Sequence, residues 1–65
     1  MIKGYNKLTD QQKDIFDKTY EKHQECVEDK SKYIPISVKP ITKTMLKVVF
    51  KNGDWYHYTS GLVWY

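Results

Sequence analysis

The last third of the chain constrains the fold most, because residues 45–65 alternate apolar and polar side chains around two turn signals. Asn52-Gly53 suits a two-residue type I′ hairpin turn, since both residues tolerate a positive φ angle. Ser60-Gly61 marks a second tight turn. We therefore predict three antiparallel strands, at residues 45–51, 54–59 and 62–65.

A two-residue turn at Asn52-Gly53 determines which side chains share a face of this sheet. It places Val49 opposite Tyr56, and the second turn then places Tyr58 opposite Val63. The face predicted to be buried carries Leu46, Val48, Phe50, Trp55, His57, Leu62 and Trp64. The face predicted to be exposed carries Lys47, Val49, Lys51, Asp54, Tyr56, Tyr58, Val63 and Tyr65. A three-residue turn with a glycine bulge is the alternative, and it would shift the register by one residue.

An amphipathic helix is predicted over residues 9–30. Thr9 is a favourable N-cap residue, and Gln12 stands at the spacing of a capping box. Asp10 lies in the first turn, where the helix dipole favours a negative charge. Side chains that can form one buried stripe recur at steps of three and four, namely Leu8, Gln12, Ile15, Phe16, Thr19, Tyr20, His23, Cys26 and Val27.

A further strand is predicted at residues 34–39, where isoleucine and valine alternate with other residues. Pro35 and Pro40 cannot donate to a β-ladder, so this strand belongs at a sheet edge. The elements predict an α+β fold in a single domain over residues 1–65. Its N-terminal amphipathic helix packs on a small three- or four-stranded antiparallel β-sheet, a meander. A chain of 65 residues buries a limited core, so a homo-oligomer or a bound partner would stabilise it.

The positive charge of the chain is concentrated in its second half. Residues 1–32 contain seven lysines and seven acids, whereas residues 33–65 contain four lysines and Asp54 alone. Arginine is absent, which disfavours bidentate reading of DNA bases. Alanine is absent as well, and the loss of both residues is typical of AT-rich genomes. This composition suggests a low-GC bacterium or its phage.

Cysteine content and hydropathy indicate a cytoplasmic protein. Cys26 is the only cysteine and cannot form a disulfide within the chain, which fits a reducing compartment. The N-terminus lacks the apolar run of a signal peptide. No stretch approaches the roughly 20 apolar residues that span a bilayer, so we expect no membrane association.

The sequence offers no convincing catalytic or metal site. His23 and Cys26 lie three residues apart on the predicted helix, but a thiol nucleophile also needs an oxyanion hole and an orienting group. With His57 they are the only soft or borderline metal donors, whereas structural zinc takes four ligands. Glycine-rich phosphate loops are absent. We therefore expect no enzyme activity, no cofactor and no bound metal.

The predicted exposed sheet face is the strongest functional signal. Its candidate contact residues are Lys47, Val49, Lys51, Tyr56, Tyr58 and Tyr65. Tyrosine anchors protein interfaces, so a protein partner is the leading expectation, with an accessory or inhibitor protein of a phage or mobile element as the role. Single-stranded nucleic acid is the alternative partner, since tyrosines can stack bases beside lysines. A third interpretation is that these tyrosines only reflect high β-propensity.

Overall fold

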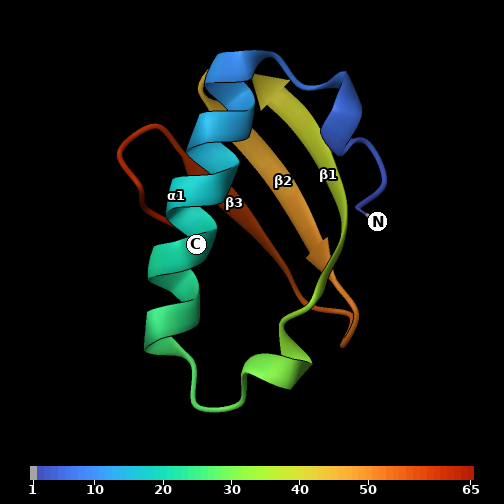
Figure 1. Cartoon of the computed structure of the whole chain (residues 1–65), viewed down its shortest axis with the longest axis vertical. Helices are drawn as coiled ribbons and strands as arrows, with labels where there is room; N and C mark the ends of the chain where they lie inside the picture. The colour runs from blue at the N-terminus through green and yellow to red at the C-terminus, as the bar shows by residue number, and fades with distance from the viewer. Residues whose placement is uncertain (1) are drawn as a thin grey trace.

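The computed structural model describes residues 2–65 and shows one helix laid across one face of a three-stranded antiparallel sheet (Figure 1). The strand order in the sheet is β1-β2-β3, so the predicted α+β fold with an N-terminal helix is confirmed. The elements are η1 (Tyr5–Lys7), α1 (Asp10–Cys26), η2 (Lys30–Lys32), β1 (Pro35–Thr42), β2 (Met45–Phe50) and β3 (Trp55–Thr59).

The helix α1 begins as predicted and ends earlier. The Thr9 hydroxyl accepts a hydrogen bond from the Gln12 N–H at 3.1 Å, and the Gln12 side chain accepts one from the Thr9 N–H at 2.9 Å. This is the predicted capping box. The helix ends at Cys26, and Val27 is already extended. The acids that follow disfavour a longer helix, because negative charge is unfavourable at a helix C-terminus.

β1 is an edge strand, as the prolines predict, and it continues three residues beyond the predicted end. Its pairing with β2 changes register at two bulges, which lie at Ile36 and Ile41. On its free edge, the N–H of Lys3 donates to the Ile36 carbonyl at 3.0 Å and the Val38 N–H donates to the Lys3 carbonyl at 2.9 Å. The N-terminal segment therefore covers part of the edge.

The predicted register between β2 and β3 is wrong by one residue. Val49 pairs with Trp55, and Val48 pairs with Tyr56. The turn contains three residues, because the Gly53 N–H donates to the Phe50 carbonyl at 3.0 Å and the Phe50 N–H donates to the Asp54 carbonyl at 2.8 Å. Gly53 has a φ of 92° and supplies the left-handed residue of this turn.

The second hairpin has the same form and is also shifted by one residue. The Leu62 N–H donates to the Thr59 carbonyl at 2.9 Å, and the Thr59 N–H donates to the Val63 carbonyl at 3.1 Å. A strand was predicted at residues 62–65, but this segment forms a single bridge, between Tyr58 and Trp64. Because the two shifts cancel, Trp64 lies on the helix side of the sheet and Tyr65 on the other side, as predicted.

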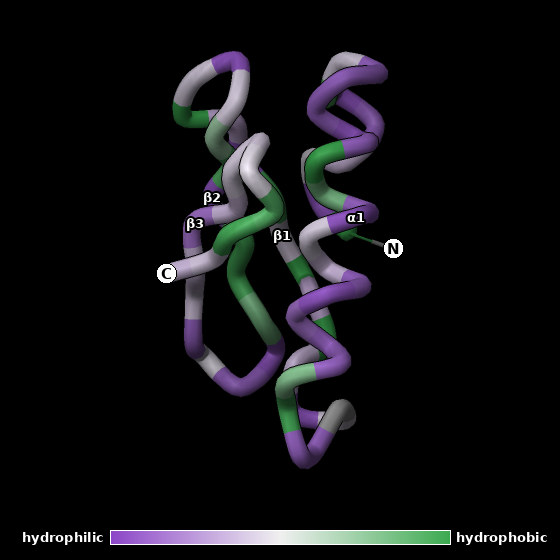
Figure 2. The backbone as a smooth tube through the Cα atoms, turned by 90° about the vertical axis from the view of Figure 1, so that its left-hand side faces the viewer, coloured by the Kyte–Doolittle hydropathy of each residue, from purple (hydrophilic) through white to green (hydrophobic). Residues whose placement is uncertain are grey.

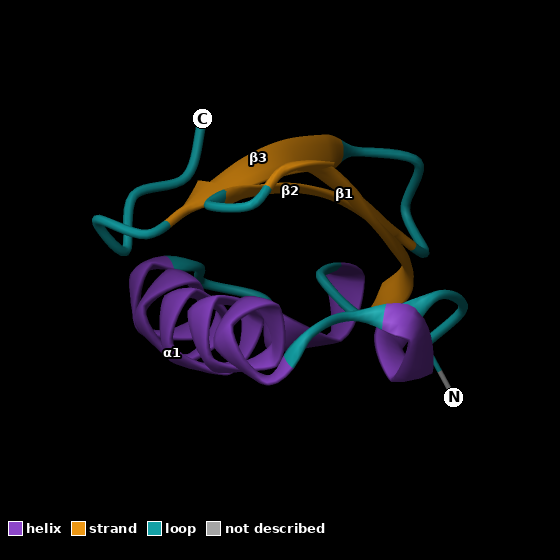
Figure 3. Cartoon of the chain, turned by 90° about the horizontal axis from the view of Figure 1, so that it is seen from above, coloured by secondary structure: helices purple, strands orange, loops and turns teal. Residues whose placement is uncertain are grey.

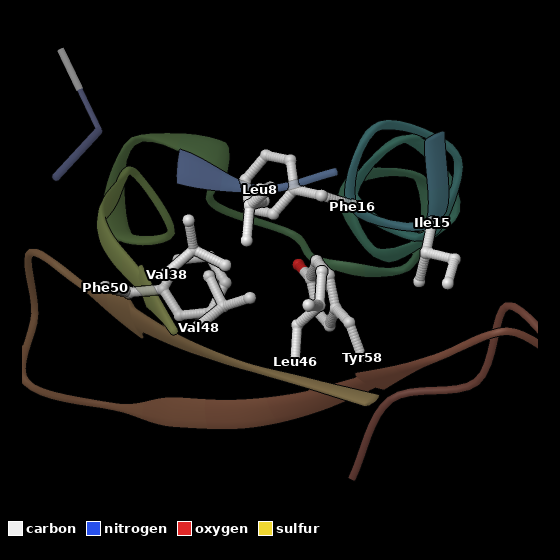
Figure 4. Packing of buried hydrophobic residues seen from close by; sticks show 8 residues of the cluster. All are labelled: Leu8, Ile15, Phe16, Val38, Leu46, Val48, Phe50 and Tyr58. Carbon is white, nitrogen blue, oxygen red and sulfur yellow. The ribbon is translucent and has the colours of Figure 1, made fainter. Parts of the chain in front are cut away.

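The hydrophobic core fills the space between α1 and the sheet (Figure 4). Its buried residues are Leu8, Ile15, Phe16, Val38, Leu46, Val48, Phe50 and Tyr58. The predicted inward positions of Leu46, Val48 and Phe50 are correct. Trp55 and Tyr58 are reversed, since Trp55 is 50% exposed and Tyr58 is 0% exposed. The shifted register turns β3 over and accounts for this exchange.

Candidate binding surface

The sheet face opposite α1 is uncovered. All three helical segments lie on one side of the sheet, and among the described residues no element lies against the other side (Figure 3). We call this side the outer face. Cross-strand pairs of Val49 with Trp55 and of Lys47 with His57 place those side chains there. The outer face carries Ser37, Lys39, Met45, Lys47, Val49, Trp55, His57, Thr59 and Tyr65.

Three rings form an aromatic row along β3 and the C-terminal segment. The row consists of Trp55, His57 and Tyr65, with ring centroids 5.2 Å apart for the first pair and 5.0 Å apart for the second. The Lys47 ammonium lies 4.7 Å from the centre of the Trp55 ring. At the other end, the Tyr65 hydroxyl lies 3.8 Å from the Met45 sulfur. Trp55 is 50% exposed and Tyr65 is 60% exposed, so the two ends of the row are open to a partner.

His57, the middle ring of the row, carries a buried nitrogen atom that lacks a hydrogen-bond partner. The Nδ1 atom of His57 is shielded from solvent and has no hydrogen-bond partner among the described residues. A buried polar atom without a partner costs about 1–3 kcal/mol. The aromatic neighbours of this imidazole are the rings of Trp55 and Tyr65.

The outer face is positively charged. Lys39 stands opposite Lys47 across β1 and β2, and none of the outer-face residues is acidic. Lys43 and Lys51 lie in the turns at the two ends of β2. Asp54 is the one acidic residue in the second half of the chain. It accepts a hydrogen bond from the Tyr33 hydroxyl at 3.2 Å.

The structure brings only part of the predicted contact set together. Lys47, Val49 and Tyr65 lie on the outer face, and Lys51 is exposed in the turn after β2. The predicted position on the exposed face is wrong for Tyr56 and Tyr58, which point toward the helix and pack in or against the core. The shifted register replaces them with Trp55 and His57, which the predicted pattern had assigned to the buried face. The alternative three-residue turn gives the observed set, but the turn residues alone do not distinguish it from a two-residue turn.

The two misassigned tyrosines belong to an inner aromatic cluster around His23. Its other members are Tyr33, Phe50 and Trp64. Nδ1 of His23 lies 2.8 Å from the Tyr58 hydroxyl, and the imidazole is only 3% exposed. Burial lowers the pKa of His23, and burial also raises the pKa of Tyr58. The uncharged forms of both side chains are therefore favoured in the folded protein.

The three potential metal donors do not meet. Cys26 is exposed at the end of α1, whereas His23 is buried beneath the sheet. His57 lies on the opposite side of the sheet from His23. Among residues 2–65, no group of three histidine, cysteine, aspartate or glutamate side chains is close enough to hold a metal ion.

Comparison of the chain with models of protein families, with curated proteins and with solved structures gave no match. Within the described part of the chain, no helix has both the length and the apolar character that crossing a membrane requires. Functional inference therefore depends on the outer face and on the chemistry of its residues.

Proposed function

We propose that this chain is a small non-enzymatic binding protein that captures another protein through its outer face. The observation that carries this proposal is the uncovered aromatic row beside Lys47. Tryptophan and tyrosine provide large contact area with few rotatable bonds, and they dominate the energetics of protein interfaces. Trp55 and Tyr65 are the two anchors.

The partner surface that fits the outer face is acidic. Lysines at the rim of an interface accelerate association with an acidic surface and select against basic ones. Four lysines, Lys39, Lys43, Lys47 and Lys51, lie on or beside the outer face. The partner also has to supply an apolar centre, because the middle of the face presents Val49 and the aromatic row.

The role that we propose is that of a cytoplasmic accessory or inhibitor protein encoded by a phage or another mobile element. The exposed free thiol of Cys26 suits a reducing compartment. The absence of arginine and alanine, which suits an AT-rich genome, supports the proposed source. A surface that acts by covering a partner requires no catalytic group.

Affinity capture with matched variants tests the proposal. Tagged wild-type protein, the double variant Trp55→Ala/Tyr65→Ala and the control Ile34→Ala are each incubated with lysate of a low-GC host. Ile34 is 44% exposed and immediately precedes β1, so the control removes an exposed apolar side chain that is not part of the aromatic row. We expect an acidic protein to be retained by the wild type and by Ile34→Ala, and to be lost by the double variant. Equal retention by all three proteins would exclude the outer face as the site that binds the partner.

Single-stranded nucleic acid is the second candidate partner. The observation that favours it is the contact between the Lys47 ammonium and the Trp55 ring on a face without acidic side chains, because such surfaces stack bases and neutralise phosphates together. Fluorescence anisotropy with labelled oligo-dT and oligo-U at 20–200 mM salt tests it. Affinity that falls steeply with salt and is lost in Trp55→Ala would favour nucleic acid. No binding at the lowest salt would remove this candidate.

A further inference from the structure

A second surface feature lies at the edge of the sheet, away from the centre of the outer face. It is an open notch of about 270 Å³ between α1 and the turn that follows β3, drawn in red in Figure 1. We call it the notch, and it is lined by Lys22, Leu62, Val63 and Trp64. Apart from the lysine, its lining side chains are apolar, and Figure 2 shows the hydrophobic stretch of this turn in green.

One wall of the notch is held in a strained backbone conformation. Leu62 has a φ of 59°, and it is the only described residue other than glycine with a positive φ. The hairpin between β2 and β3 has the same form and places Gly53 at this position. Gly61 immediately precedes Leu62, so the glycine does not occupy the position with the positive φ. A leucine is sterically disfavoured in the left-handed region, and such strain concentrates at functional positions. We therefore expect the Leu62 side chain to have a function that offsets the cost of this strain.

The floor of the notch is rigid. The Trp64 ring stacks on the imidazole of His23, with the centroids 5.0 Å apart and an interplanar angle of 28°. His23 is in turn fixed by the Tyr58 hydroxyl at 2.8 Å. Because both supporting groups are buried, the floor is formed before any ligand arrives, which lowers the entropic cost of binding.

The rim of the notch carries one available positive charge. Lys22 forms no ion pair among residues 2–65, whereas Lys18, one turn earlier on α1, is paired with Asp14 at 3.1 Å. No acidic side chain lines the notch. An anionic group beside an apolar one is therefore the complementary ligand.

We infer that the notch binds one large apolar side chain of a protein ligand, with a neighbouring carboxylate of that ligand held by Lys22. The volume of about 270 Å³ is below the usual range of small-molecule sites, which begins near 300 Å³, and it suits a single indole, phenyl or isobutyl group. The notch shares no residue with the aromatic row, and the inference does not depend on the function proposed for the outer face.

The carboxylate preference is tested with two probes that differ only in charge. N-acetyl-tryptophan and its neutral carboxamide are titrated into ¹⁵N-labelled protein, and amide chemical shifts are followed by NMR. We expect both probes to shift Lys22 and residues 62–64, and the carboxylate to bind two- to fivefold more tightly, which is the range of an exposed ion pair. Shifts centred elsewhere, or no shifts at 20 mM probe, would overturn the inference.

Two lysine variants identify the source of the preference. In Lys22→Gln, both probes should bind with equal affinity, while Lys18→Gln should retain the full difference. Lys18 is the matched control because it has the same charge and lies one helical turn away. A preference that survives in Lys22→Gln would show that the carboxylate is bound elsewhere.

A variant of Leu62 separates the role of this residue in binding from its role in stability. Leu62→Gly should relieve the positive-φ strain and raise the melting temperature, and it should weaken N-acetyl-tryptophan binding severalfold by removing one wall of the notch. A lower melting temperature would show that the leucine is retained for packing. Unchanged affinity would show that its side chain does not contact the ligand, and either result would overturn the inference.

Discussion

His23 shows how one buried side chain links the pH of the solution to the stability of the fold. Its imidazole is surrounded by the inner aromatic cluster, and its Nδ1 atom lies 2.8 Å from the Tyr58 hydroxyl. Burial favours the neutral ring, so the pKa of His23 in the folded protein lies below the ordinary value of 6.5. The unfolded chain therefore takes up a proton at a higher pH than the folded chain does.

This linkage has a definite sign. As the pH falls from about 7 through 6.5, the unfolded state gains a proton before the folded state, and the free energy of unfolding decreases. The decrease ends once the pH is below the folded-state pKa. Urea unfolding at intervals between pH 8 and pH 5 measures it. His23→Gln should lose most of this pH dependence. The same slope in His23→Gln and the wild type would contradict the assignment.

Gly4 is a residue at which both backbone conformation and space exclude a side chain. Its φ is 88°, and a Cβ atom there would overlap the carbonyl oxygen of Val38. We expect Gly4→Ala to lower the free energy of unfolding by at least about 1–2 kcal/mol, the cost of the left-handed conformation alone. Urea unfolding checks this value. Gly61→Ala is the control, because Gly61 lacks a positive φ and its nearest atoms are 3.9 Å from the added carbon; a comparable loss in this variant would contradict the explanation.

At the scale of whole elements, the sequence predicted the helix start, which depends on residues close in sequence, but not the pairing of the strands. The start of α1 depends on Thr9 and Gln12, which lie three residues apart, and the sequence places it correctly. The β2–β3 register depends on whether Gly53 is the second residue of a two-residue turn or the third of a three-residue turn. Both turns require a positive φ at that glycine, so the turn residues alone do not choose. The choice is made by the packing of β3 against distant residues of α1, such as His23.

The capping box gives a prediction at this scale. Thr9→Ala removes the hydroxyl that accepts from the Gln12 N–H at 3.1 Å, and we expect a loss of about 1 kcal/mol in the free energy of unfolding. Thr9→Ser keeps the hydroxyl and should stay close to the wild type. Urea unfolding followed by helical circular dichroism measures both variants. Equal losses in the two variants would show that the methyl group of Thr9, and not its hydrogen bond, stabilises the helix start.

For the whole molecule, the two faces of the sheet carry different kinds of aromatic residue. On the inner side, tyrosines contribute to the core, and the Tyr58 hydroxyl has a partner in His23. On the outer side, Trp55 and Tyr65 remain exposed. The alternation of the sequence predicted that one face is buried and one is open, and it identified Lys47, Val49 and Tyr65. It exchanged the β3 residues because a shift of one residue reverses every side chain of a strand.

The aromatic residues on the two faces of the sheet should contribute differently to stability. Tyr58 is 0% exposed, so Tyr58→Ala leaves a cavity in the core and should lower the free energy of unfolding by about 3–5 kcal/mol. Chains of this length have little stability to lose, so we expect this variant to be largely unfolded at 25 °C. Trp55 is 50% exposed, and Trp55→Ala should change stability by less than about 1 kcal/mol. Near-ultraviolet circular dichroism and urea unfolding of both variants make the comparison.

The register predicted from a two-residue Asn52-Gly53 turn requires the opposite result, with Trp55→Ala unfolded and Tyr58→Ala folded. Tyr58→Phe refines the test, because it keeps the ring and removes only the hydroxyl that lies 2.8 Å from His23. Loss of a buried hydrogen bond that leaves its partner unsatisfied costs about 1–3 kcal/mol, so this variant should fall between the wild type and Tyr58→Ala. A Tyr58→Phe variant as stable as the wild type would mean that the ring alone, without its bond to His23, holds β3 against α1.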